Sequence, residues 1–369
     1  MSSSLPVPLL RCPFDALTLD MISGAAVFVD REDGVTKAQK PFARVTFRNA
    51  TGMATVAVWA ECLPDFVGIA VGAPVAITLT REVGRDGTPE WRYKSIRPLP
   101  PNHAVAKEAL PSCPVPRAKL NARTVALVAA LSPEARALFD VITKTPIRLA
   151  DGAPLAPLTS RYFDAPAALS RHHAVIGGLW WHSLQVTELA VALAAAYGAS
   201  GDAPGLDLDA IRLGGLLHDV GKVIEYTWTG TLAMAPLSGS MSHMGFGLRL
   251  VTEALTRAEA AGQWAPTPRQ AELAEHLQHC IASHHGRQDW GAIVVPASRE
   301  ALLLHQADMC SSHVQPLTDA LVPLAEKGWV RVKEGWKTRM LFASPTVELP
   351  AAEPLVTLDV DLPSDAGEE

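Results

Sequence analysis

A proline-rich stretch divides this sequence into two parts whose hydrophobic residues repeat with different periods. Six prolines fall between Pro98 and Arg117, and such a run is typical of a linker. Before it, apolar and polar residues alternate, which favours β-strands. After it, apolar residues recur at i, i+3 and i+4, which favours α-helices. We therefore expect an α+β multidomain protein with four parts: a β domain (11–99), a linker (100–117), an α domain (118–325), and a hairpin with an acidic tail (326–369).

Short strands account for the first part and longer helices for the second. The strand pattern occurs in residues 26–30, 41–48, 53–59, 75–80 and 91–97. Five strands with turn residues between them predict a small β-barrel. The helical period occurs in residues 124–131, 133–142, 178–197, 208–217, 242–255, 269–282 and 299–314.

Composition excludes several classes of protein. The 369 residues are 48% hydrophobic and 19% charged, which is too apolar for a disordered chain. No run of eighteen apolar residues is free of charges and breakers, so we expect no membrane span. The first residues lack a secretory pattern, and five scattered cysteines form no C-x-x-C. We therefore expect reduced thiols and a cytoplasmic location.

The β domain carries a weak signal for nucleic-acid binding. Its residues 11–99 contain 11 basic and 10 acidic side chains, whereas the whole chain has a net charge of −6. Trp91 and Tyr93 alternate with Arg92 and Lys94, so the two aromatic rings share one strand face. They either stack on bases at an exposed face or belong to the barrel core. The residues that we predict to bind nucleic acid are Trp91, Tyr93, Arg44, Arg48, Lys94 and Arg97.

An ordered series of histidines and aspartates carries the strongest chemical signal. In the pattern H…HD-x-G-K…H…HH…D, imidazoles and carboxylates come from five separate helical segments. Such side chains can converge at the centre of a bundle, and this mixture suits Mn²⁺, Fe²⁺, Co²⁺ or Zn²⁺. The seven candidate ligands are His182, His218, Asp219, His243, His284, His285 and Asp308.

Adjacent ligands at His218 and Asp219 need a helix end, because neighbouring helical residues diverge by about 100°. We expect Gly221 to provide that end. A single histidine on an apolar helix is more often an ordinary core or surface residue than a ligand. We interpret five others in this way: His103, His276, His279, His305 and His313.

The motifs around these residues resemble those of the HD-domain metal-dependent phosphohydrolases. They are Phe163-Asp-Ala-Pro-Ala-Ala168, His172-His-Ala-Val-Ile-Gly-Gly-Leu179, Leu216-Leu-His-Asp-Val-Gly-Lys222 and Leu277-Gln-His-Cys-Ile-Ala-Ser-His-His-Gly286. Together with the β domain, residues 16–314 look like the YhaM-type 3′-to-5′ exoribonucleases, which join an OB-fold to an HD domain. The resemblance implies an OB-like barrel over 11–99 and an HD domain over 118–325.

The resemblance also implies roles for individual residues. His182, His218, Asp219 and Asp308 would hold one ion, and Asp219 would bridge to a second ion at His243, His284 and His285. Lys222 would face the scissile phosphate, so Lys222 and Asp219 are the predicted catalytic residues; a solvated lysine at a helix end is the alternative. Arg171, His172 and His173 could bind substrate phosphate or form an ordinary helix-start surface.

The expected function is therefore hydrolysis of single-stranded RNA from its 3′ end, with DNA left open. The expected cofactor is one or two divalent ions, with Mn²⁺ first and Fe, Co, Zn or Mg as alternatives. Two other functions stay open: hydrolysis of free or cyclic nucleotides, and non-catalytic nucleic-acid binding on a mobile element. We expect no membrane partner, and whether the chain forms a homo-oligomer is left open.

Overall fold

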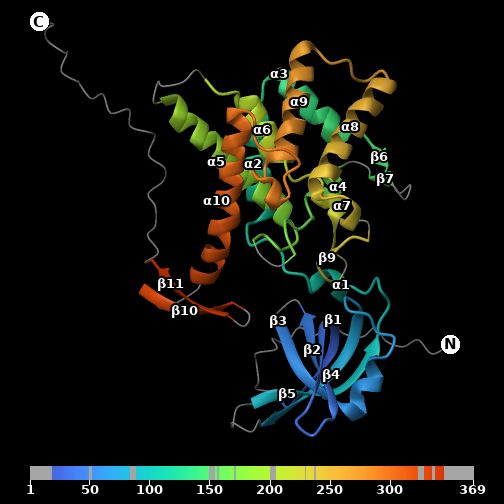
Figure 1. Cartoon of the computed structure of the whole chain (residues 1–369). Coiled ribbons are helices and arrows are strands. Elements are labelled where there is room, and N and C mark those ends of the chain that lie inside the picture. The colour runs from blue at the N-terminus through green and yellow to red at the C-terminus, as the bar shows by residue number, and fades with distance from the viewer. Residues whose placement is uncertain are drawn as a thin grey trace, which may run out of the picture. The chain divides into compact units, whose positions relative to one another are not determined.

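The computed structural model describes residues 19–49, 52–83, 89–148, 154–155, 158–169, 172–199, 205–228, 230–236, 238–322, 328–334 and 337–344. The chain forms two compact units, residues 1–313 and 314–369. The first unit contains a β part followed by a helical part (Figure 1). Arg171, the hairpin tip at residues 84–88 and the acidic tail lie outside the described residues.

Five antiparallel strands form the β part, in the order β3-β2-β1-β4-β5. The strands are β1 (Met21–Val35), β2 (Pro41–Asn49), β3 (Gly52–Trp59), β4 (Pro74–Val83) and β5 (Pro89–Pro98), with the 3-10 helix η1 (Ala60–Phe66) between β3 and β4. The long strand β1 pairs with β2 through one half and with β4 through the other. The edge strands β3 and β5 contact each other, but no hydrogen-bonded ladder between them closes the described sheet. The strand order and the contact between the edges are OB-like.

Alternation along these strands fills the inside of the sheet. On β2, Ala43, Val45 and Phe47 are buried, whereas Arg44 is exposed and Arg48 is half-buried. Phe28 and Phe66 pack with Phe47 in the same core. One face of the sheet therefore carries the β core. The other carries polar and basic side chains on β2, and Ala25 and Val27 of β1 in a small cluster with Val105 and Ala109.

The helical part contains ten helices among the described residues, some of a single turn. They are α1 (Val105–Glu108), α2 (Arg117–Ala129), α3 (Pro133–Lys144), α4 (Thr159–Tyr162), α5 (Gly178–Ala199), α6 (Leu208–Leu217), α7 (Lys222–Glu225), α8 (His243–Ala260), α9 (Pro268–Ser283) and α10 (Arg299–Leu321). The shorter elements are β6 (Ile147–Arg148), β7 (Pro154–Leu155), β8 (Tyr226–Thr227), β9 (Ala233–Met234), η2 (Ser238–Ser240) and η3 (Gln288–Trp290). The predicted fold class, a β part followed by a helical domain, is confirmed.

Side-chain caps define where the helices around the core begin. Thr267 and Gln270 form a capping box at the start of α9, with Pro268 as its first residue. Asp207 accepts hydrogen bonds from the first backbone N–H groups of α6. Because these caps satisfy otherwise unpaired N–H groups, each helix begins at a fixed residue. The caps also fix the rotation of the ligand residues at the far ends of α6 and α9.

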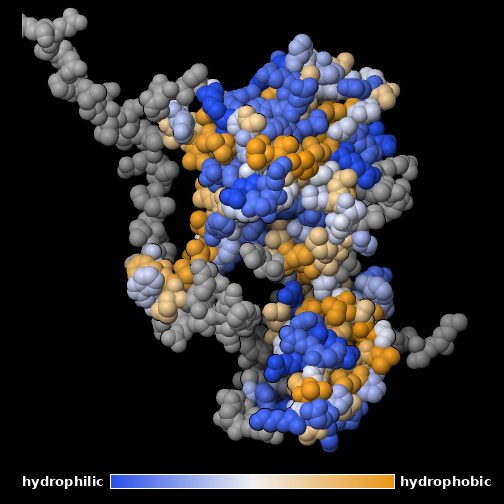
Figure 2. Space-filling model, in the orientation of Figure 1, coloured by the Kyte–Doolittle hydropathy of each residue, from blue (hydrophilic) through white to orange (hydrophobic). Residues whose placement is uncertain are grey.

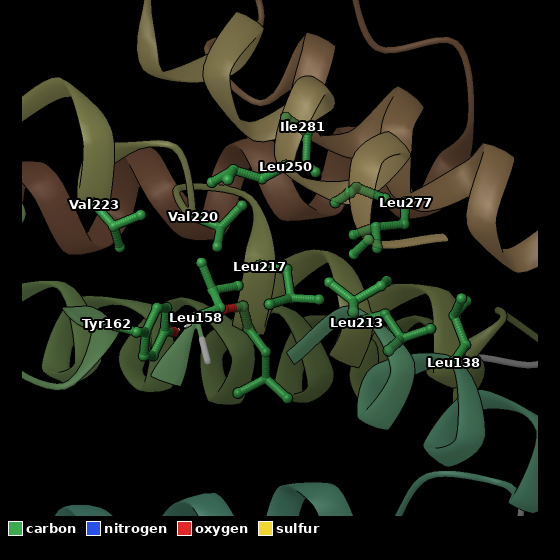
Figure 3. Packing of buried hydrophobic residues seen from close by; sticks show 14 of the residues in the cluster. Leu138, Leu158, Tyr162, Leu213, Leu217, Val220, Val223, Leu250, Leu277 and Ile281 are labelled. Atoms are coloured by element: carbon green, nitrogen blue, oxygen red, sulfur yellow. Dashed lines mark hydrogen bonds between the residues drawn. The ribbon is translucent and has the colours of Figure 1, made fainter. Parts of the chain in front are cut away.

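The apolar faces of α6, α8 and α9 meet in the main core. Figure 3 shows Leu213 and Leu217 of α6 facing Leu250 of α8 and Leu277 and Ile281 of α9. All five side chains are at most 3% exposed. Close packing of this kind has few voids, so a shift of one helix moves the others. The core therefore holds the helix ends that carry the site in a fixed arrangement.

The second unit contains a hairpin of β10 (Gly328–Glu334) and β11 (Lys337–Ala343). In the described part of the chain no helix is both long and apolar enough to cross a membrane. On the visible face of the helical part, hydrophilic and hydrophobic side chains are interspersed (Figure 2). The four described cysteines are free thiols: Cys62, Cys113, Cys280 and Cys310.

Gly221 has a different role from the one predicted. Helix α6 ends at Leu217, and Gly221 has ordinary right-handed backbone angles (φ −65°, ψ −17°) as the residue before α7. A Cβ at this position would lie 1.8 Å from the carbonyl oxygen of His243 and 2.6 Å from the amide of Gly247. The glycine is therefore needed because α8 passes directly against it.

We predict that Gly221→Ala destabilises the protein by about 3 kcal/mol, the upper part of the usual range for overpacking, because the clash is with rigid backbone. Chemical denaturation followed by circular dichroism measures the free energy of unfolding. The matched control is Gly198→Ala in α5, where a Cβ meets nothing within 4 Å; we expect a change below about 1 kcal/mol, in the stabilising direction. Equal effects of the two substitutions would contradict the close approach at Gly221.

Candidate metal centre

The structure brings together all seven predicted ligand residues, which come from the ends or middles of five helices. Three lie at helix ends because the chain turns there: His218 caps α6, His243 begins α8 and His284 caps α9. The others are His182 in α5, Asp219 and His285 directly after a helix cap, and Asp308 in α10. Five of the seven are at most 7% exposed, as for a site built into a bundle core.

A first group forms around one oxygen of Asp219. His182 Nε2 and His218 Nε2 each lie 3.4 Å from Asp219 Oδ2. Asp308 Oδ1 lies 3.1 Å from His182 Nε2 and 4.0 Å from His218 Nε2. Two imidazoles and two carboxylates therefore direct one atom each toward a common point.

A second group forms around the other oxygen of the same carboxylate. His243 Nε2 and His284 Nε2 lie 3.4 and 3.5 Å from Asp219 Oδ1, and 3.4 Å from each other. The ring of His285 lies 4.6 Å from that of His284 and 5.0 Å from that of His243, centroid to centroid. Asp219 thus presents one oxygen to each histidine group, which is the arrangement of a bridging ligand.

The second ring nitrogen, Nδ1, of each of these histidines has a partner that fixes the ring. For His218, His284 and His285 the partner is a backbone carbonyl, and for His243 and His182 it is a side chain. The pairs are His218 with Gly215 O at 3.0 Å, His284 with Ile281 O at 2.9 Å, His285 with Trp290 O at 2.9 Å, His243 with Glu225 Oε2 at 3.1 Å and His182 with Ser311 Oγ at 3.0 Å. Ligand histidines in metal sites are held in this way.

These partners also determine which nitrogen carries the proton. A carbonyl or carboxylate oxygen only accepts, so the facing Nδ1 must be the N–H donor, and in the neutral ring Nε2 then keeps its lone pair. Ser311 donates its hydroxyl proton to Gln185 Oε1 at 3.0 Å, so it accepts from His182 Nδ1. In their neutral forms, the five rings therefore offer Nε2 lone pairs to a metal ion.

Unpaired polar atoms at the centre support a bound cation. His182 Nε2, His218 Nε2 and Asp219 Oδ1 are buried without a hydrogen-bond partner among the described residues. Leaving such atoms unpaired is unfavourable unless something else satisfies them. The donor set of imidazole nitrogens and carboxylate oxygens is one that divalent transition ions accept. The residues present therefore fit the metal that the sequence predicts.

The electrostatics of the site favour positive charge. Burial lowers the pKa of His243, His284 and His285, which keeps their imidazoles neutral near pH 7. Although burial alone would raise the pKa of Asp219, the nearby Lys222 ammonium and His218 lower it well below its usual value. Burial would also lower the pKa of His182, but the facing carboxylates of Asp219 and Asp308 raise it above its usual value. The site thus combines three neutral imidazoles and an ionised Asp219 with a histidine that holds a proton more readily.

Lys222 lies inside the site and is not a solvated lysine. Its ammonium is 2.6 Å from Asp219 Oδ2, and the residue is 7% exposed. Burial would lower the pKa of Lys222, but the Asp219 carboxylate raises it, so the side chain stays charged. Asp219, Lys222 and Asp308 line a cavity of about 310 Å³. A substrate group can therefore reach both the carboxylates and the ammonium.

Sequence reasoning missed the residue that orients His243. Glu225 accepts a hydrogen bond from the backbone N–H of His243 at 2.9 Å and another from its ring at 3.1 Å. One carboxylate thus both caps α8 and fixes the ligand that begins it. A lone glutamate three residues after Lys222 has no pattern that distinguishes it.

His172 and His173 lie closer to the site than an ordinary helix-start surface would. The rings of His172 and His173 are 5.2 and 5.1 Å from that of His182, and His172 lines the cavity. Burial and the neighbouring His182 lower the pKa of His172 to about 3 and that of His173 to about 2. Both rings are therefore neutral. Their role in binding phosphate stays a prediction.

The predicted nucleic-acid residues of the β part are not all at the surface. Trp91 is only 8% exposed and packs in the β core, so of the two alternatives that the sequence left open, the core position holds for this residue, and its place among the nucleic-acid-binding residues is corrected. Tyr93 packs on Phe66, 5.3 Å between ring centroids, and donates a hydrogen bond to Asp65 at 2.7 Å. The reason is that alternation defines the two faces of a strand but does not tell which one faces inward.

The four basic residues of that set lie on the outer side of the sheet. Arg44, Lys94 and Arg97 are exposed, and Lys94 is the extra residue of a β-bulge between β4 and β5. Arg48 is half-buried and donates to Met53 Sδ at 3.0 Å. These four side chains are available to a polyanion, and their binding of nucleic acid stays a prediction.

Comparison with known proteins identifies the class of the helical part. Residues 179–312 match the family model described as HD domain, and this range contains all seven candidate ligands. Residues 179–312 are thus similar to HD domains, and His/Asp groups that could hold a metal ion lie within this range.

The chain as a whole is similar to curated bacterial exoribonucleases. It is 25% identical over 312 residues to 3′-5′ exoribonuclease YhaM of Geobacillus sp. (strain WCH70), covering 84% of this chain and 85% of that protein. It is 26% identical over 312 residues to 3′-5′ exoribonuclease YhaM of Bacillus subtilis (strain 168), covering 84% and 88%. The resemblance predicted from the motifs is confirmed.

We predict that Glu225→Gln weakens the binding of one metal ion by about 10- to 100-fold, because the amide holds His243 less firmly than the carboxylate does. Calorimetric titration of metal-free protein with Mn²⁺ measures this. The control is Glu253→Gln on α8, whose carboxylate pairs with Arg257 at 2.9 Å, and it should bind as the wild type does. Unchanged affinity in Glu225→Gln would show that Glu225 does not position a ligand.

Proposed function

We propose that this protein is a metal-dependent exonuclease that hydrolyses single-stranded RNA from its 3′ end. The observation that carries the proposal is the single carboxylate, Asp219, whose two oxygens face two groups of inward-pointing histidine nitrogens. Similarity to 3′-5′ exoribonuclease YhaM over 84% of the chain supports the substrate class and the direction. DNA is a further substrate to test.

The residues divide into two ligand sets in this proposal. His182, His218 and Asp308 hold one ion with Asp219, and His243, His284 and His285 hold a second ion with it. Bound there, divalent ions such as Mn²⁺ supply Lewis acidity that polarises a phosphodiester and neutralises its charge. The helix ends that carry these ligands are fixed by the core, so the ligand set is in place before substrate arrives.

Lys222 is the residue of the chain that acts on the phosphate in this proposal. Its ammonium already lies at the cavity beside Asp219, 2.6 Å from Oδ2. Negative charge that develops on the phosphoryl oxygens during hydrolysis is stabilised by a positive group placed there beforehand. The burial of Lys222 strengthens this effect, because water screens the charge less.

The β part holds the single strand in this proposal. Arg44, Arg48, Lys94 and Arg97 lie on its outer side and follow the phosphates. Tyr93, about half-buried, offers only part of its ring for stacking, so the electrostatic contribution is the larger one.

A time course on single-stranded RNA, labelled at either the 3′ or the 5′ end, tests the function. With Mn²⁺ we expect the 3′ label to be released at once as a mononucleotide and the 5′-labelled strand to shorten stepwise. Chelator should stop both reactions. Replacing Mn²⁺ with Mg²⁺ measures the preference for the metal ion, and replacing RNA with a DNA strand measures the preference for the nucleic acid. If the protein hydrolyses free or cyclic nucleotides but not RNA strands, it is a nucleotide phosphohydrolase and not an exonuclease. Strand binding with full metal content but no turnover would favour the binding-factor alternative.

We predict that Asp219→Ala abolishes hydrolysis and lowers the metal content while the helical fold persists, because both ligand sets lose their shared oxygen atoms. Metal analysis and circular dichroism accompany the RNA time course. The control Asp140→Ala removes a half-exposed carboxylate that pairs with Lys144 at 2.9 Å, and it should keep full activity. Near-normal hydrolysis by a folded, metal-loaded Asp219→Ala protein would contradict the shared-ligand assignment.

We predict that Lys222→Met lowers kcat by about 10²- to 10³-fold, as loss of one preorganised electrostatic donor does. KM should change much less and metal content should stay the same, because an ammonium is not a ligand. The control is Lys144→Met, in which the lost ammonium pairs with Asp140 at 2.9 Å at the surface. A normal kcat would exclude the catalytic role, and a depleted metal content would show that Lys222 only supports the ligands.

A further inference from the structure

An exposed tryptophan lies at the rim of the cavity that contains the candidate metal ligands. Trp290 lines the same cavity of about 310 Å³ as Asp219, Lys222 and Asp308. Its side chain is 48% exposed, although an indole ring is among the most favourable groups to bury. Ile293, three residues further along the chain, is 45% exposed. An apolar surface therefore adjoins a charged site. A ligand with an apolar group and a charged group would contact both.

The backbone around Trp290 is tied to a metal ligand. Its carbonyl oxygen accepts the hydrogen bond from His285 Nδ1 at 2.9 Å, so the segment that presents the ring also orients the histidine. The 3-10 helix η3 ends at Trp290, and Gly291 follows in the left-handed region (φ 95°), where glycine is favoured. The position of the ring is thus set relative to the ligand set.

A positive group lies over the indole. The guanidinium carbon of Arg287 is 5.2 Å from the centroid of the Trp290 ring, and Arg287 also pairs with Asp289 at 2.9 Å. The cation–π contact restrains the indole at the rim, where an unrestrained exposed ring would be mobile. A ring held in one orientation loses less entropy when a planar group stacks on it.

The chemistry of the cavity defines the ligand. The carboxylates would bind a phosphoryl group through metal ions, and the Lys222 ammonium would bind it by direct charge. The indole would bind a flat aromatic group by stacking. A cavity of this volume is at the small end of ligand pockets. A single nucleotide carries both a phosphate and a planar base, and the two lie close together. We propose that Trp290 is the platform on which the terminal nucleobase stacks while its phosphodiester lies at the metal centre. This inference rests on the proposed exonuclease function.

Among the described residues that line the cavity, Trp290 is the one tryptophan, tyrosine or phenylalanine. In the β part, Trp91 is in the core and Tyr93 packs on Phe66. Stacking on a ring beside the reacting phosphate is independent of sequence, because every base has an aromatic face. An enzyme that removes successive nucleotides of any sequence needs such a contact.

The test compares two RNA strands that are identical except for the 3′-terminal nucleotide, which carries a base in one and is abasic in the other. With Mn²⁺-loaded wild type, we expect the abasic strand to have a KM roughly 5- to 100-fold higher, the usual range for one lost base stack. Trp290→Ala should raise KM for the normal strand by the same factor and abolish the difference between the strands. Trp290→Phe should keep most of the difference, because it keeps an aromatic face.

Two controls separate binding from folding. Because the hydrogen bond to His285 uses the backbone of Trp290, Trp290→Ala should keep the wild-type metal content. Trp329→Ala, at a 71% exposed tryptophan of the C-terminal hairpin, should leave both KM values unchanged.

Four results would overturn the inference. If Trp290→Ala keeps the wild-type difference between the strands, or raises KM equally for both, the ring does not stack on the terminal base. Loss of metal in Trp290→Ala would show that the indole supports the ligands. A wild type that cleaves neither strand would instead overturn the exonuclease function and this inference with it.

Discussion

The hydrogen bond at Nδ1 of each ligand histidine is the interaction on which the candidate site depends. Without it, a buried imidazole could rotate or change tautomer, and Nε2 would not face the centre. The carbonyls of Gly215, Ile281 and Trp290 each hold one ring. A carbonyl oxygen only accepts hydrogen bonds, so it keeps the proton on Nδ1. The backbone therefore determines that Nε2 of each neutral ring offers its lone pair to the centre of the site.

The core in turn holds these carbonyls and the helix ends in place. In α6, Leu213 lies five residues before His218 and Leu217 lies directly before it, and Ile281 of α9 lies three residues before His284. Helices α6 and α9 therefore bury leucine and isoleucine in their last turns and present a candidate ligand at the residue that caps each helix. At Gly221 the packing of α8 is so close that a methyl group does not fit, which ties the second histidine group to the first.

The sequence predicted the fold class and the seven residues that the structure brings together, because both rest on patterns with few alternatives. The change of period at the prolines separates strands from helices, and the order of histidines and aspartates is rare. Four features were not predictable. Glu225 has no distinguishing context, and the carbonyl partners involve no particular side chain. Trp91 was placed on the right strand, but strand alternation does not tell which face is inside. Gly221 was expected to end a helix, yet close packing against α8 explains it.

The central claim is that the histidines are preset to hold divalent ions through Nε2 atoms around Asp219. Anomalous diffraction at the manganese edge, on crystals of the Mn²⁺-loaded protein, tests this most directly. The account predicts anomalous peaks on both sides of the Asp219 carboxylate, one bonded to Nε2 of His182 and His218, the other to Nε2 of His243 and His284. The absence of a peak among these residues, or a peak bonded to Nδ1 atoms, would contradict it.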